Sequence, residues 1–171
     1  LVGGAEYGDI LATLAGTNTT LAAGAAGVAA VFTNYIVLQR TTGEGQYDLI
    51  VTMNGVLGGL VAITAGCAVV EPWAAVIIGL FAGIFYLLGS RALIKCHLDD
   101  AVDAIPVHMI NGVWGMVATG LFATPTRLQQ AYGNADHPGL FYSGAGGGAD
   151  FALFGAQFVG TFFIVAWTIG I

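Results

Sequence analysis

The sequence is organised around the stretch DDAVDAIPVHMINGVWG, residues 99–115. Three aspartates lead into an apolar run, residues 104–123, which contains a single histidine, His108. In a segment that crosses a membrane, an imidazole is costly unless it faces a pore or a partner. At helical spacing the run has two different faces. One is small and polar, with His108, Gly112, Gly115 and Thr119, and the other is bulky and apolar, with Ile105, Met109, Val113 and Met116. This pattern is typical of a helix that lines a space on one side and meets lipid or protein on the other.

The composition predicts a membrane protein. The chain is 57% hydrophobic and 8% charged, whereas soluble domains are about a quarter charged. A soluble core cannot bury this much apolar surface, and the 27 glycines favour close helix packing in lipid. Four basic residues exclude a nucleic-acid-binding surface. We therefore expect an all-α, polytopic transmembrane helical bundle surrounded by membrane lipid.

Five apolar segments are predicted to cross the membrane, at about 20 residues per crossing. Small residues four apart, as in Gly55-x-x-x-Gly59 and again at Gly79 and Gly83, predict close helix contacts. We expect polar loops over residues 89–103 and 124–150. The chain starts at a leucine and ends inside an apolar run, so we expect one domain that is an internal piece of a larger protein. The predicted segments are 10–38, 49–70, 73–88, 104–123 and 151–171.

Basic residues predict the orientation of the segments. Arg40 lies in the loop after the first segment, and Arg91 and Lys95 lie in the loop after the third. Loops rich in Lys and Arg remain on the cytoplasmic side. The turn near residue 71 and the loop 124–150 are therefore expected outside.

The candidate site depends on His108. It could be a packing residue bonded to a neighbouring carbonyl, but its place beside Gly112 and Gly115 favours a functional role. Asp100 and Asp103 are interpreted as caps of the following helix, with orientation of His108 as the alternative. The spacing of His97 and these aspartates matches no metal-ligand pattern, and His137 is expected in solvent. No catalytic or cofactor motif is present, so we expect no metal, no cofactor and no enzyme.

Three stretches carry a likeness to a known family: NGVLGGLVAITAGC (54–67), VEPWAA (70–75) and the run from Asp99 through His108 to Ala123. With them, the chain resembles the ammonium transporter, methylammonium permease and Rhesus family over essentially its whole length. Phe141-Tyr142 and the run from Gln157 to Trp167 are similar to the plant and algal members.

The resemblance implies an eleven-helix inverted-repeat fold, of which this chain is a C-terminal-half fragment, and a homotrimer with a pore through each subunit. His108 matches the second of two pore histidines, and the first lies in the N-terminal half. Further pore-lining candidates are Thr64, Ala104 and Gly112.

The function implied is transport of ammonium or ammonia, with methylammonium as a further candidate, across the plasma membrane. Ammonium would lose its proton, cross as ammonia and leave the histidines to relay the proton. One alternative is an ammonium sensor of the same fold with little transport. Another is an intramembrane enzyme, which would need a second catalytic residue facing His108, and the sequence shows none.

Overall fold

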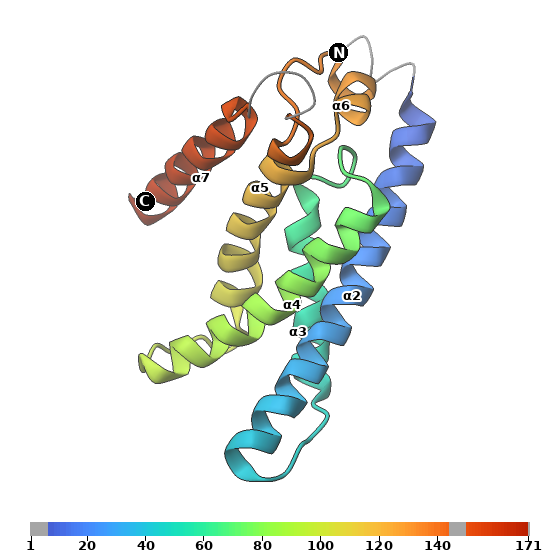
Figure 1. The fold of residues 1–171 in the computed structure, drawn as a ribbon. Helices are drawn as coiled ribbons and strands as arrows, with labels where there is room; N and C mark the ends of the chain where they lie inside the picture. Colours follow the sequence, from blue (N-terminus) through green and yellow to red (C-terminus); the bar gives the residue numbers. More distant parts are fainter. Residues whose placement is uncertain (1–6, 144–149, 171) are drawn as a thin grey trace.

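The computed structural model describes residues 7–143 and 150–170, and all regular structure within them is helical (Figure 1). Ile171, the end of the last predicted segment, and residues 144–149 of the predicted outer loop lie outside the described residues. The elements are α2 (Gly8–Thr42), α3 (Leu49–Thr64), α4 (Pro72–Lys95), the π-helix η1 (Ile105–Ile110), α5 (Asn111–Phe122), α6 (Pro125–Tyr132), the 3₁₀-helix η2 (Leu140–Tyr142) and α7 (Ala152–Gly170).

Four helices of the described chain are long and apolar enough to cross a membrane. These are α2, α4, the continuous helix η1–α5 and α7. The fifth apolar helix, α3, has 16 residues. Helices α2, α3 and α4 pack together, α5 packs on α3 and α4, and α7 lies at the edge of the bundle beside α5 (Figure 1).

An alanine stripe on α2 forms the contact among the three packed helices. Ala22, Ala26 and Ala30 follow one another at four-residue spacing, and each is 0% exposed. The predicted glycines meet this stripe: a Cβ on Gly59 or Gly79 would collide with Ala22, and one on Gly83 with Ala26. Only residues without side chains allow the backbones to approach this closely, so van der Waals packing and not bulk hydrophobicity holds the three helices together.

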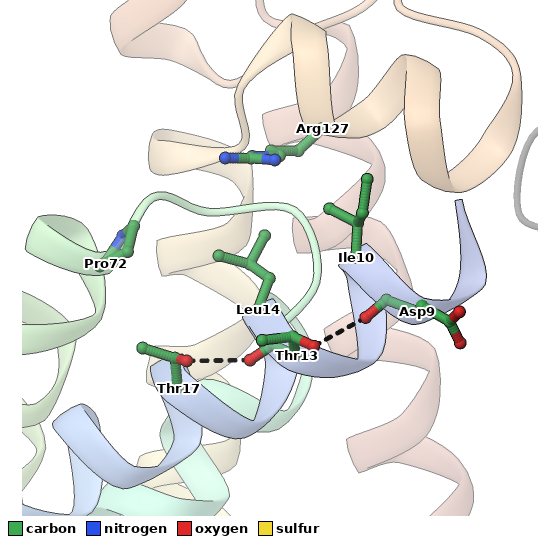
Figure 2. Close-up of a pocket in the computed structure, with 7 residues that line it drawn as sticks. All are labelled: Asp9, Ile10, Thr13, Leu14, Thr17, Pro72 and Arg127. Carbon is green, nitrogen blue, oxygen red and sulfur yellow. Dashed lines mark hydrogen bonds between the residues drawn. The ribbon is translucent and has the colours of Figure 1, made fainter.

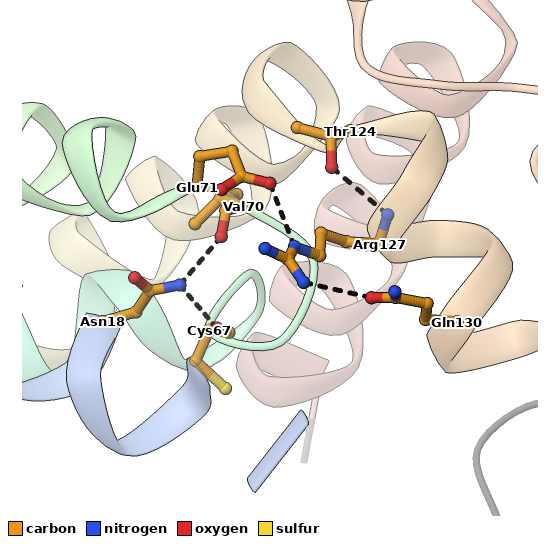
Figure 3. Close-up of polar contacts among 7 residues, drawn as sticks. All are labelled: Asn18, Cys67, Val70, Glu71, Thr124, Arg127 and Gln130. Atoms are coloured by element: carbon orange, nitrogen blue, oxygen red, sulfur yellow. Dashed lines mark hydrogen bonds and ion pairs between the residues drawn. The ribbon is translucent and has the colours of Figure 1, made fainter. Parts of the chain in front are cut away.

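Helix α3 ends at Thr64, six residues before the end of the predicted segment. Residues 65–70 form turns instead, in which the N–H of Val69 and of Val70 donates to the Gly66 carbonyl. Asn18 of α2, which is fully buried, stabilises these turns (Figure 3). Its Nδ2 donates to the carbonyls of Cys67 and Val70, both at 2.8 Å. Residues 65–70 are apolar, so their sequence alone does not indicate turns. The hydrogen bonds from Asn18 of α2 stabilise them in this conformation.

Two regions predicted as loops are partly helical. Helix α4 continues to Lys95, seven residues past the predicted end, because Ser90 donates to Asp103 and Arg91 donates to Asn34 of α2. The predicted outer loop contains α6, which Pro125 begins and Thr124 caps through its hydroxyl.

Candidate functional site

The histidine at the centre of the sequence lies in a π-helix. Residues Ile105–Ile110 form one wide turn before the chain continues as α5. A π-helical turn contains an extra residue between hydrogen-bonded groups and is rare, and such turns are frequent at functional sites. The side chain of Asn111, which is fully buried, donates to the Pro106 carbonyl at 3.0 Å and so supports this turn.

Two aspartates fix the start of this helix, in different ways. The carboxylate oxygens of Asp100 accept from the backbone N–H groups of Ala104 and Ile105, at 2.9 and 2.8 Å. Asp103 differs from its predicted role as a cap, because its carboxylate accepts from the hydroxyls of Tyr86 and Ser90 on α4, both at 2.9 Å. Its φ of 56° lies in the left-handed region, which aspartate adopts more readily than most residues. Asp103 therefore joins the start of η1 to α4.

The side of α5 that faces the bundle is tightly held. Trp114 donates its indole N–H to the Ile78 carbonyl of α4 at 3.0 Å. A Cβ on Gly115 would collide with the Ala62 carbonyl of α3, and Thr119 is 5% exposed. One side of the helix that carries His108 is thus closely packed against α3 and α4, and its other side is less closely packed.

The less closely packed side borders a cavity of about 570 Å³ between α3, η1–α5 and α7. Most of its lining is aliphatic. Its threonine hydroxyls, on Thr64, Thr161 and Thr168, each donate to the carbonyl four residues earlier in their own helices at 2.8 Å. His108 is exposed to this space, and its imidazole is the one ring with nitrogen atoms among the described lining residues. The lining is Val61, Thr64, Ala65, His108, Met109, Gly112, Val113, Met116, Thr161, Ile164, Val165, Thr168 and Ile169.

The structure brings together three of the predicted site residues. His108, Gly112 and Thr64 border the same cavity, whereas Ala104 lies exposed at the start of η1 and is not part of the lining. The predicted separation into two faces is wrong in its detail. Gly115 packs on α3 and Thr119 packs on the turns that follow α3. Met109, Val113 and Met116 border the cavity with His108. The π-helical turn of η1 contains an extra residue, so the residues of α5 that share a face with His108 are shifted from those that a regular α-helical period predicts.

Sequence reasoning missed the contribution of α7. Five of its residues line the cavity, yet none of its residues is buried and it carries no ionisable side chain between 152 and 170. Its hydroxyls at positions 161 and 168, seven residues apart, share a helix face. This spacing was the available sequence indication.

A second cavity, of about 420 Å³, lies at the opposite end of the bundle from the loop joining α2 and α3. Thr13 and Thr17 of α2 border it together with Pro72 and Arg127 (Figure 2). The guanidinium of Arg127 donates to Glu71 at 3.0 Å and to Gln130 at 3.1 Å (Figure 3). Arg127 therefore connects α6 to the start of α4, which gives this cation a structural role.

His137 is exposed, as predicted, but it also has a partner. Its Nδ1 lies 2.7 Å from Oδ2 of Asp150. The hydrogen bond and the negative charge of Asp150 raise the pKa of His137 above its usual 6.5, and the same hydrogen bond lowers the pKa of Asp150. Within the described residues, no group of three or more His, Cys, Asp or Glu side chains could hold a metal ion.

Comparison with known proteins gives consistent matches. A family model described as "Ammonium Transporter Family" matches residues 3–171. Ammonium transporter 1 member 3 of Solanum lycopersicum is 41% identical over 150 residues, which cover 87% of this chain and 31% of that protein.

Solved structures match as well. The crystal structure of Saccharomyces cerevisiae Mep2 matches with a TM-score of 0.79 and 26% identity, over 94% of this chain and 33% of that chain. A structure described as "Sensor Amt Protein" matches with a TM-score of 0.69 and 30% identity, over 94% of this chain and 35% of that chain. The chain spans about a quarter to a third of the length of the curated relatives it matches.

Proposed function

We propose that this chain, which belongs to the ammonium transporter family, contributes one wall of a path along which ammonia crosses a membrane. The chain is an all-helical, multi-pass membrane fragment that matches part of the Mep2 fold. Its family is one of transporters and not of enzymes. The observation that carries the proposal is the position of His108, an imidazole that borders an otherwise mostly aliphatic cavity.

The chemistry of the cavity favours a neutral solute. A charged ion is very costly to bring into apolar surroundings without compensating partners. The threonine hydroxyls donate their protons to their own helices, so each can only accept a hydrogen bond from a solute. These acceptors suit the N–H groups of ammonia as well as those of ammonium, and the aliphatic lining is what disfavours the charged form. Ammonium that reaches this region would lose a proton and continue as ammonia. His108 would bind the ammonia and carry the proton, together with the second histidine that the resemblance implies.

Uptake of labelled methylammonium by the protein in proteoliposomes tests this role. His108→Ala removes the imidazole from an exposed position, so the fold should persist while uptake falls at least tenfold. Met116→Leu, which nearly conserves the volume of another lining residue, is the matched control and should retain uptake near the parental rate. Parental uptake by His108→Ala at equal protein level would show that the histidine is not used.

A sensor is the second candidate, and the likeness to the structure described as "Sensor Amt Protein" favours it. A sensor would bind ammonium without comparable flux. Binding measured by calorimetry together with uptake at the background level would support the sensor, and uptake that saturates with substrate would support the transporter.

We also propose that the protein assembles as a homotrimer, which is the assembly that the family resemblance implies. Native mass spectrometry of the protein released from detergent should give three copies. A monomer or dimer under conditions that preserve its helical content would contradict this assembly.

A further inference from the structure

One carboxylate connects the start of α7 to the loop after α6. Oδ1 of Asp150 accepts from the backbone N–H of Ala152 at 2.8 Å, in the first turn of α7. Its other oxygen, Oδ2, meets Nδ1 of His137 at 2.7 Å. The N–H group at the start of α7 and the imidazole of His137 therefore bind the same carboxylate. A change in the charge of His137 thus acts on the side chain that caps α7.

The His137 side of this contact is firmly anchored. Two residues later, Gly139 donates its N–H to the Ala123 carbonyl at the end of α5, at 2.8 Å. Gly139 lies so close that a Cβ there would come within 2.6 Å of the Ala123 nitrogen and the Leu121 oxygen. Phe141 then packs on Phe122, with ring centroids 5.1 Å apart. The position of His137 is thus set by α5.

The Asp150 side of the contact belongs to a weakly held helix. Helix α7 packs mainly on α5, and none of its residues is buried. Helix α7 also forms one side of the cavity that contains His108. A contact that fixes the start of α7 therefore influences the shape of this cavity.

Few other charges lie on the elements around this contact. Helices α5 and α7 carry no ionisable side chain. Helix α6 carries Arg127, which is paired with Glu71, and Tyr132, and η2 carries Tyr142. Asp136, next to His137 in the chain, is the other carboxylate that acts on the imidazole. The His137 side chain is 63% exposed, so solvent protons reach it directly.

We propose that His137 and Asp150 form a pH-dependent clasp that holds the start of α7 to the loop anchored on α5 most tightly while the imidazole is protonated. When the proton is lost, the charge on the imidazole is lost with it, and only the weaker hydrogen bond of a neutral imidazole can remain. The charge pattern of the loops predicts that this end of the bundle faces outside. The clasp would therefore make the position of α7 respond to external pH.

The direction of the pH dependence follows from the partners. Asp150 raises the pKa of His137 in the folded protein. The stabilising contribution of the charge is therefore fully present below the unfolded value of about 6.5 and is lost as pH rises through the folded value. Asp150 has a lowered pKa, so its contribution disappears only at strongly acidic pH, when the carboxylate itself is protonated.

Hydrogen exchange of the first turns of α7 tests the clasp in the protein held in lipid nanodiscs. Protection factors for amides in residues 152–160 are compared between the parent and His137→Ala at pH 5.5 and at pH 9. The comparison at a single pH removes the intrinsic pH dependence of exchange. The parent should be about two- to fivefold better protected than His137→Ala at pH 5.5, the range expected of an exposed ion pair. This advantage should be clearly smaller at pH 9.

Two further variants separate the clasp from other effects. Asp150→Asn can still accept from the Ala152 N–H but has no charge, so it should remove the difference between the two pH values. Asp136→Asn is the matched control and should keep the parental profile. Equal protection of parent and His137→Ala at pH 5.5, or an equal advantage of the parent at both pH values, would overturn the proposal, as would parental pH dependence in Asp150→Asn. Exchange does not depend on transport, so these outcomes are independent of the proposed function.

Discussion

Asn18 provides the sharpest test of how the bundle is stabilised. Asn18→Ala removes the two hydrogen bonds that Nδ2 donates to the carbonyls of Cys67 and Val70. A buried polar group left without a partner costs about 1–3 kcal/mol, and two carbonyls lose their partner. One gain offsets part of this cost, because Oδ1 of Asn18 is itself buried without a partner among the described residues and disappears in the variant. The carbonyl of Cys67 is also only partly buried. The net loss in the free energy of unfolding should be about 2 kcal/mol.

The assay is equilibrium unfolding in mixed micelles with increasing SDS, followed by tryptophan fluorescence. Thr17→Ala is the matched control, because this neighbouring hydroxyl donates only to Thr13 in its own helix. It should change stability by no more than about 0.5 kcal/mol. Asn18→Asp should be worse than Asn18→Ala, since it places a carboxylate against two carbonyl oxygens. If Asn18→Ala is as stable as Thr17→Ala, the turns after α3 do not depend on this amide.

Three further predictions concern packing, the cavity and orientation. Gly79→Ala should destabilise the protein by about 1–3 kcal/mol in the same assay, because its Cβ overpacks against Ala22. Gly24 has open space around it, so Gly24→Ala should be neutral or slightly stabilising. Equal effects of the two substitutions would contradict the packing described. Gly112→Ala should be tolerated, since the nearest atom to its Cβ is Val61 Cγ1 at 4.0 Å. Gly112→Leu should instead fill the cavity and strongly reduce methylammonium uptake. Parental uptake by the leucine variant would show that this cavity is not part of the path. In a background without Cys67 and Cys96, a cysteine at Asn134 should react with an impermeant reagent from outside and one at Gly43 should not; equal labelling would refute the orientation.

The class of fold could be predicted because composition and small-residue spacing reflect the whole environment. A chain with 8% charged residues must bury its apolar surface in lipid, and Gly79 and Gly83 do pack on α2 as their spacing predicts. The end of α3 at Thr64 could not be predicted, because residues 65–70 are apolar and their turns depend on Asn18, about fifty residues away in sequence.

The position of His108 on a cavity could be predicted, whereas the rest of the cavity lining could not. A lone histidine in an apolar run, with Gly112 and Gly115 at helical spacing, indicates that His108 borders a space. Part of the remaining lining lies on α3 and α7, and its position depends on how these helices pack. The rest lies on the helix of His108, where the π-helical turn departs from the regular period and Met109 and Met116 border the cavity. Asp103 resembles a cap in sequence, but it accepts from the hydroxyls of Tyr86 and Ser90 on α4. Ser90 lies in the part of α4 beyond its predicted end, so this contact could not be expected from the sequence.

The central proposal, that His108 carries the proton while nitrogen crosses as neutral ammonia, is tested most directly by ion selectivity. Currents are recorded from proteoliposomes on a solid-supported membrane, with ammonium or potassium as the cation, for the parent, His108→Ala and His108→Glu. A carboxylic acid can still hold a proton or attract a cation. We expect ammonium current without potassium current in the parent, loss of current in His108→Ala, and current from both cations in His108→Glu. Parental discrimination against potassium in His108→Glu, or parental ammonium current in His108→Ala, would contradict the account.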